Sequence, residues 1–163
     1  MTLEDILSFL HDVEMFGNLN DSELSEIVSI MDVQSFRANQ RIFSENEIGD
    51  GWFVIYKGKV GVEKRTPFIA DQVVAELGPS VCLGEMAILD DSPRSATVVA
   101  MDQTQLFHFS KRKFNQLIKS GSLAAYKMVY GMAGTLAKRQ RVLNQKYTEL
   151  QKEIAAMESV QIA

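Results

Sequence analysis

From about Val33 to Phe109, the apolar residues of this 163-residue chain follow the two-residue period of β-strands, whereas the flanking segments have a helical period. The apolar residues of this stretch fall in short runs, and turn sequences containing glycine or proline separate the runs. Six runs are predicted to be strands: residues 40–43, 52–56, 59–63, 72–77, 96–100 and 104–109. Many short strands joined by such turns are typical of a sandwich or a jelly roll.

Helical patterns lie on both sides of this β region. Residues 3–11 and 22–31 are predicted to be short amphipathic helices, and Asn20 to Ser22 supply N-cap residues for the second. We therefore expect an α+β, mainly β fold, in which a β jelly-roll barrel is combined with N-terminal helices and a long C-terminal helix. The expected organisation is an N-terminal helical segment at 1–32, the β-roll at 33–110, and C-terminal helices with a coiled coil at 111–163.

Composition excludes several classes of function. A net charge of −4 and a pI near 5.2 are unlike a general nucleic-acid-binding surface, so we expect no direct nucleic acid binding. No apolar run approaches the length of a membrane span, and no signal peptide is evident. The single cysteine, Cys82, fits a reducing cytoplasm, and His11 and His108 are too few for a metal centre. The sequence thus predicts a cytoplasmic protein with no membrane span and no metal.

Residues 83–98 hold a pattern unlike that of a plain core segment. Glu85 and Arg94 are nine residues apart, among glycine and alanine residues that let a ligand approach the backbone closely. Arginine can fork two hydrogen bonds onto phosphate oxygens, and a carboxylate accepts hydrogen bonds from sugar hydroxyls. A helix that starts here would add backbone N–H groups for an anion. The segment predicts a pocket for a sugar phosphate.

The same segment carries a family resemblance. Gly84-Glu85-x-Ala87, followed by Pro93-Arg94-Ser95-Ala96-Thr97-Val98, resembles the phosphate-binding cassette of cyclic nucleotide-binding domains. Catabolite activator proteins and protein kinase A regulatory subunits share this cassette. The resemblance spans roughly residues 13–140 and implies that Arg94 binds the cyclic phosphate. It also implies that Glu85 accepts a hydrogen bond from the ribose 2′-hydroxyl, while backbone N–H groups of Met86 and Ala87 meet the phosphate.

Other interpretations stand beside these. Arg94 could be a surface arginine paired with Asp90 or Asp91, and Glu85 a first-turn acid of a helix at Met86–Leu89. Ser95 either serves a phosphate oxygen or a guanine amino group, or is only a small residue at a strand start. We expect cyclic AMP as the ligand, with cyclic GMP also bound. Three further residues complete the predicted binding set: Ala96, and Cys82 with Val74 bordering the base.

The C-terminal region carries a heptad pattern over more than four repeats. Two interleaved series recur every seven residues: Val129, Leu136, Leu143, Leu150 and Met157, and Tyr126, Ala133, Gln140, Tyr147 and Ile154. The pattern predicts a coiled coil and a parallel homodimer. In the family's register, Thr135 and Arg139 lie near the base. Arg139 either stacks on or hydrogen-bonds to the purine, or pairs with a charge across the dimer.

The sequence therefore predicts a non-enzymatic cyclic nucleotide receptor that couples ligand binding to a C-terminal dimer helix. We expect no catalytic residues, no cofactor beyond the nucleotide, and an unknown downstream effector. No DNA-binding domain is expected, because the sequence ends within the dimer helix, at Gln161-Ile162-Ala163. Two alternatives remain open. One is a dimerisation module of the same fold that binds no ligand, and the other is the sensory part of a larger effector protein.

Overall fold

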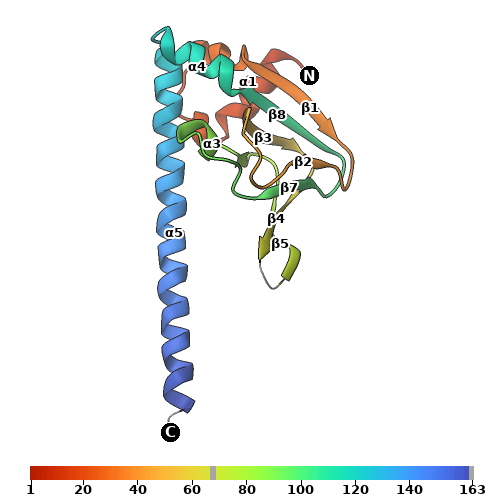
Figure 1. The fold of residues 1–163 in the computed structure, drawn as a ribbon. Coiled ribbons are helices and arrows are strands. Elements are labelled where there is room, and N and C mark those ends of the chain that lie inside the picture. The colour runs from red at the N-terminus through yellow and green to blue at the C-terminus, as the bar shows by residue number, and fades with distance from the viewer. Residues whose placement is uncertain (67–68, 162–163) are drawn as a thin grey trace.

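The computed structural model describes residues 1–66 and 69–161, which form two antiparallel sheets flanked by helices (Figure 1). One sheet has the order β1-β8-β3-β6. Its strands are β1 (Met31–Phe36), β8 (Thr104–Ser110), β3 (Gly51–Lys57) and β6 (Cys82–Leu83). The other sheet has the order β2-β7-β4-β5. Its strands are β2 (Arg41–Phe43), β7 (Thr97–Ala100), β4 (Val60–Thr66) and β5 (Ile69–Leu77).

The expected mainly β roll is confirmed, with one difference in detail. The described strands form two separate sheets and not a closed barrel, and the edge strands β2 and β6 have only three and two residues. All six predicted strands are present within a few residues. The sequence did not predict β1 or β6. β1 is a largely exposed strand at the edge of its sheet with no regular alternation of buried residues, and β6 has only two residues.

Alternating side chains of β3 and β8 belong to two different cores. Trp52 and Val54 of β3 face the helices, together with Phe107 and Phe109 of β8. The neighbouring residues face the space between the sheets, where the second core contains Phe43, Phe53, Ile55, Val60, Leu83, Val98 and Leu106. These two strands are buried on both faces, so they fix the sheet relative to the helices.

The N-terminal helices are α1 (Leu3–His11), the 3₁₀ helix η1 (Glu14–Phe16) and α2 (Asp21–Val28). Thr2 and Asp5 form a capping box at the start of α1, and Asn20 and Glu23 form one at α2. The predicted helix at 22–31 therefore begins one residue earlier and ends at Val28, since Met31 already belongs to β1. Two short helices, α3 (Met86–Leu89) and α4 (Lys111–Lys119), follow β6 and β8.

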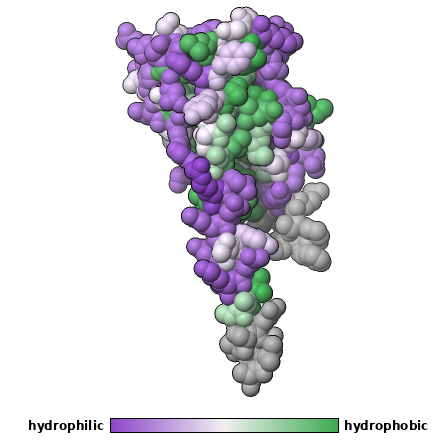
Figure 2. All heavy atoms as spheres, turned by 90° about the vertical axis from the view of Figure 1, so that its left-hand side faces the viewer, coloured by the Kyte–Doolittle hydropathy of each residue, from purple (hydrophilic) through white to green (hydrophobic). Residues whose placement is uncertain are grey.

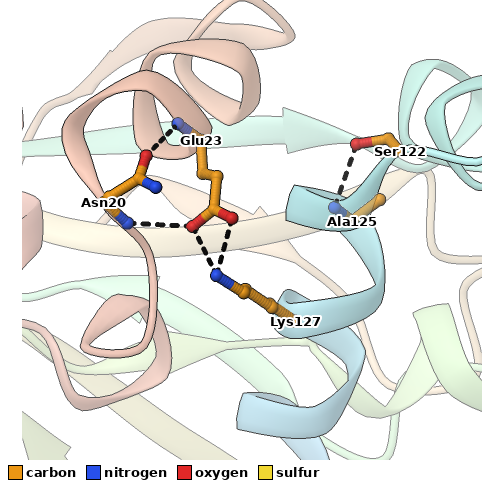
Figure 3. Close-up of polar contacts among 5 residues, drawn as sticks. All are labelled: Asn20, Glu23, Ser122, Ala125 and Lys127. Carbon is orange, nitrogen blue, oxygen red and sulfur yellow. Dashed lines mark hydrogen bonds and ion pairs between the residues drawn. The ribbon is translucent and has the colours of Figure 1, made fainter.

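The last helix, α5 (Leu123–Gln161), is anchored to the domain by its first half. The Ser122 hydroxyl caps the helix by accepting a hydrogen bond from the Ala125 amide, and Lys127 is paired with Glu23 of α2 at 2.6 Å (Figure 3). Gly131 lies against η1 so closely that a β-carbon there would come within 2.5 Å of the Met15 carbonyl oxygen. These contacts give the near half of α5 a fixed position against the N-terminal helices.

The second half of α5 runs past the sheets (Figure 1). Residues 137–157 are all exposed. Figure 2, which looks onto α5, shows hydrophobic residues in the upper part of this face and again toward the lower end of the helix. The exposed apolar residues of this half are Val142, Leu143, Tyr147, Leu150, Ile154 and Met157. Within the described part of the chain, no helix is long and apolar enough to cross a membrane.

Candidate functional site

A cavity of about 330 Å³ lies at the end of the roll where α3 and α5 meet the second sheet. Its volume is at the lower end of the range for small-molecule sites. The wall is made by the segment from Val81 to Met86, the segment from Pro93 to Ala96, and Arg139 of α5. The remaining lining residues come from the strands: Phe43, Val62, Leu77 and Val98. The two halves of the predicted cassette therefore face each other across one cavity.

Arg94 is buried in the wall of this cavity. Its guanidinium group donates hydrogen bonds to the carbonyl oxygens of Gly84 (3.0 Å) and Gly51 (2.8 Å). The same group lies over the ring of Phe43, 4.4 Å from the ring centre, and 3.5 Å from a carboxylate oxygen of Asp50. The interpretation of Arg94 as a surface residue paired with Asp90 or Asp91 is not what the structure shows, because its side chain is only 2% exposed.

Burial lowers the pKa of the Arg94 guanidinium, and the carboxylates of Asp50, Glu47 and Glu85 oppose that shift. Arginine nevertheless keeps its proton at any physiological pH. One of its donors, Nε, is buried and has no hydrogen-bond partner. The site thus holds a permanent positive charge with a donor left over, which is a suitable arrangement for an anionic group.

Gly84 is required by its conformation and by its neighbour. Its φ of +73° is a left-handed value that glycine adopts readily. A β-carbon at this position would also collide with Nη1 of Arg94. The glycine therefore lets the two halves of the cassette approach each other and lets Arg94 reach the Gly84 carbonyl.

Glu85 is buried and has a partner that the sequence did not predict. Its carboxylate accepts a hydrogen bond from Nη1 of Arg139, which also donates through Nη2 to the Cys82 carbonyl at 3.3 Å. Glu85 is 2% exposed, whereas the side chain of Arg139 is 47% exposed. Residues 54 positions apart thus join α5 directly to the cassette. Of the two interpretations of Arg139, neither contact with a base nor pairing across a dimer describes this ion pair.

The other predicted site residues are found in four places. Met86, Ser95, Ala96 and Cys82 line the cavity. Burial raises the pKa of the Cys82 thiol to about 12, so this cysteine stays protonated and behaves as a small apolar residue. Ala87 is in α3, and its side chain is outside the described part of the chain.

Two predicted residues do not line this cavity. Val74 lies on β5 and is 58% exposed. Thr135 lines a smaller cavity of about 200 Å³, which shares Val81, Cys82 and Arg139 with the first. Its hydroxyl oxygen is buried there without a hydrogen-bond partner. Arg139, like Val81 and Cys82, therefore borders both cavities.

Sequence reasoning also missed Phe43 and Asp50 as neighbours of Arg94. Phe43 was recognised only as part of a strand, and the signal for Asp50 was its place in a turn before an apolar run. Both come close to Arg94 only through the pairing of distant strands. Among the described residues, no group of histidine, cysteine, aspartate or glutamate side chains is arranged to hold a metal ion.

Comparison with known proteins agrees with this geometry. The family model described as "Cyclic nucleotide-binding domain" matches residues 33–121, which is more than half of the chain. The chain belongs to the cyclic nucleotide-binding domain family. The matched region contains β2 to β8 and the whole cassette, and it ends in the turn before α5.

Three relatives show how far the similarity extends. A cAMP-dependent protein kinase regulatory subunit of Dictyostelium discoideum is 30% identical over 112 residues, which are 67% of this chain and 34% of that protein. The cyclic AMP receptor protein of Thermus thermophilus is 28% identical over 127 residues, 78% of this chain and 57% of that protein. A crystal structure of a cyclic nucleotide-binding domain from Methylobacillus flagellatus superimposes with a TM-score of 0.77 at 26% identity, covering 88% of this chain and 80% of that one. The chain thus spans only about a third of one of these curated relatives and somewhat more than half of the other.

Proposed function

We propose that the protein is a cyclic nucleotide receptor in which ligand binding between Glu85 and Arg94 is transmitted to a dimer formed along α5. The observation that carries the proposal is the shared cavity: a buried guanidinium, a buried carboxylate and a side chain of α5 meet in one place. The relatives named above are regulatory subunits and receptor proteins, which supports a receptor over an enzyme.

Arg94 is the phosphate-binding residue of this proposal. Its charge would attract the cyclic phosphate, and its partnerless Nε–H supplies a donor that the protein itself does not use. The backbone N–H groups of Met86 and Ala87 are the further donors expected for the phosphate. Because Arg94 also holds the carbonyls of Gly84 and Gly51, it contributes to the stability of the cassette as well as to binding.

Glu85 is the ribose-binding residue and the point of coupling. Its carboxylate would accept a hydrogen bond from the 2′-hydroxyl, and the same carboxylate is now bound to Arg139. In this proposal the nucleotide and Arg139 of α5 both bind to the carboxylate of Glu85. A ligand can move α5 only if it binds more tightly to one arrangement of the Glu85–Arg139 pair than to the other.

The base is expected to lie among the apolar residues at the mouth of the cavity. Ser95 and Ala96 line the wall, together with Val62 and Leu77. Both interpretations of Ser95 remain, so the proposal keeps cyclic AMP as the main ligand and cyclic GMP as a second one. Thr135 would reach the base only from the smaller cavity, which shares Arg139 with this one.

The output of the receptor is proposed to be a parallel homodimer along α5. Beyond Gln140 the heptad residues are exposed and apolar: Leu143 is 60%, Tyr147 62%, Leu150 55% and Ile154 55% exposed. A sustained seam of this kind is stabilised when a second helix covers it. A downstream effector of unknown identity would respond to the dimer geometry.

One observation favours a second function. Glu85 already has a protein partner, and both Nη groups of Arg94 donate to backbone carbonyls. A dimerisation module that binds no nucleotide would have this kind of internally satisfied site. The two functions differ in one measurable property, the affinity for a cyclic nucleotide.

A thermal-shift series separates the two functions. Binding to the folded state raises stability by RT ln(1 + [L]/Kd), so a ligand at about 100 times Kd adds about 2.7 kcal/mol. We expect cyclic AMP to raise Tm, cyclic GMP to raise it less, and linear AMP to leave it unchanged. The 2′-deoxy analogue of cyclic AMP should shift Tm much less, because a hydrogen bond to a charged group contributes about 1.5–3 kcal/mol. No shift with any cyclic nucleotide would favour the dimerisation module.

A further inference from the structure

His108 lies on the inner face of β8, behind Arg94. It is 6% exposed, and its ring is 4.8 Å from the ring of Phe53, centre to centre. Its neighbours in the chain, Phe107 and Phe109, point the other way into the helical core. A histidine in this position faces the space between the sheets, toward the polar end of the roll that holds the cassette.

The imidazole of His108 and the guanidinium of Arg94 share one carboxylate. Nε2 of His108 is 3.6 Å from Oδ1 of Asp50, and Nη2 of Arg94 is 3.5 Å from the same oxygen. The ring also packs directly against the backbone of Gly51, whose carbonyl accepts the hydrogen bond from Nη2. His108 therefore touches two of the groups that hold Arg94 in position.

Nε2 of His108 is buried and has no hydrogen-bond partner. An unpaired buried nitrogen is costly, and protonation would turn the 3.6 Å contact with Asp50 into an ion pair. Asp32 lies directly opposite His108 on β1. Lys111 begins α4 with its backbone N–H on the Asp50 carbonyl, and its ammonium group is paired with Asp91 at 2.5 Å.

We propose that His108 is a positioning residue for Arg94, and that its protonation strengthens cyclic nucleotide binding in mildly acidic solution. This inference rests on the proposed function of the cassette. When the imidazole is neutral, the carboxylate of Asp50 offsets the charge of only one cation, Arg94. With an imidazolium, Asp50 is shared between two cations, and the net positive charge behind the phosphate rises by one. Because linkage is reciprocal, the anionic ligand binds more tightly at low pH, and the protein takes up a proton at His108 when the ligand binds.

The experiment compares cyclic AMP affinity by calorimetry at pH 8.0 and pH 5.5 and at one ionic strength. An unperturbed histidine titrates near pH 6.5, between these values, whereas carboxylates titrate near pH 4. A charge within about 10 Å of the phosphate at an effective dielectric constant of 20 to 40 predicts about three- to tenfold tighter binding at pH 5.5. At pH 6.5 the binding enthalpy should depend on the ionisation enthalpy of the buffer, which reports proton uptake in the unmodified protein.

His108→Gln should abolish both the pH dependence and the proton uptake. The matched control is His11→Gln, since His11 is the other histidine of the chain and is bound to Asp21 at the start of α2. That variant should keep the full pH dependence.

Affinity equal at both pH values, or a pH dependence that persists in His108→Gln, would overturn the inference. Absence of binding at either pH would instead overturn the proposed function. If His108→Gln does not fold, a buffer-independent enthalpy in the wild type would overturn the inference, and a buffer-dependent one retained in His11→Gln would support it.

Discussion

The two halves of α5 differ in what holds them. Up to Met132, buried side chains pack against η1 and α2, and Lys127 is paired with Glu23. Beyond Ala137 every residue with a described side chain is exposed. The change occurs at Arg139, which is bound to Glu85 of the cassette. The comparison shows that the candidate site contacts α5 close to the point where its packing against the domain ends.

The largest expected effect is a difference between the two halves of α5 in how much a substitution lowers the free energy of unfolding. Met128→Ala should lower the free energy of unfolding by about 2–5 kcal/mol, because Met128 is fully buried and its removal leaves a cavity. Met157→Ala makes the same chemical change at a side chain that is 68% exposed. It should change stability by less than about 0.5 kcal/mol in dilute, monomeric protein. Urea unfolding of both variants checks this, and equal losses would show that the far half is packed in the monomer too.

The second prediction concerns association along the far half. Leu143→Glu places a charge in the proposed seam and should weaken dimerisation at least tenfold, roughly 1.4 kcal/mol or more, measured by sedimentation equilibrium. Gln145→Glu adds the same side chain on the outer face of the helix and should leave dimerisation unchanged. A wild-type protein that is monomeric at micromolar concentration would contradict the dimer proposal outright.

A third, smaller effect tests the junction between the halves. Cyclic AMP should alter hydrogen exchange in residues 137–150 of the wild type, because Arg139 is bound to Glu85, the residue proposed to bind the ribose. Arg139→Gln should remove this response to the ligand, while Arg141→Gln, two residues further along the helix, should retain it. A response that survives in Arg139→Gln would mean that the signal reaches α5 by another route.

The smallest effect concerns the Glu23–Lys127 pair in the near half. The hydrogen bond from Lys127, and then that from the Asn20 amide, hold the pKa of Glu23 below its usual value. A lowered pKa in the folded state means that the stabilisation is present above the unfolded pKa and is lost as the pH falls through the folded one. Lys127→Met should therefore lower Tm slightly at pH 7 and make no difference well below pH 4, while Lys152→Met should have no effect at either pH. An undiminished difference in acid would exclude Glu23 as the cause.

Local sequence patterns predicted most of the cassette. Gly84, Glu85 and Arg94 lie within a dozen residues, and a short helix and a turn between them bring all three to the wall of one cavity. Val74 shows the limit of such reasoning. The alternation in β5 identified the strand, but it did not reveal that Val74 would lie on an exposed face.

Contacts between residues far apart in the chain could not be predicted from the sequence pattern. The Glu85–Arg139 pair depends on the path of α5 across the mouth of the roll, and that path is set by Gly131 on η1 and by Lys127 on α2. The sharing of Asp50 by Arg94 and His108 depends on the register of β3 with β8. Neither is encoded in a short spacing. The dimer, the cytoplasmic location and the choice between cyclic AMP and cyclic GMP stay predictions.

Titration calorimetry of cyclic AMP into the wild type and Arg94→Ala tests the central claim most directly. We expect one nucleotide per chain in the wild type. In Arg94→Ala the affinity should fall at least tenfold, because truncating one partner of a buried charge pair costs roughly 2–5 kcal/mol. Arg94→Lys keeps the positive charge but loses the two-pronged guanidinium, so its affinity for cyclic AMP should lie between those of the other two proteins. Thermal melts of all three proteins check that each is folded. Unchanged affinity in a folded Arg94→Ala, or no binding by the wild type, would contradict the account.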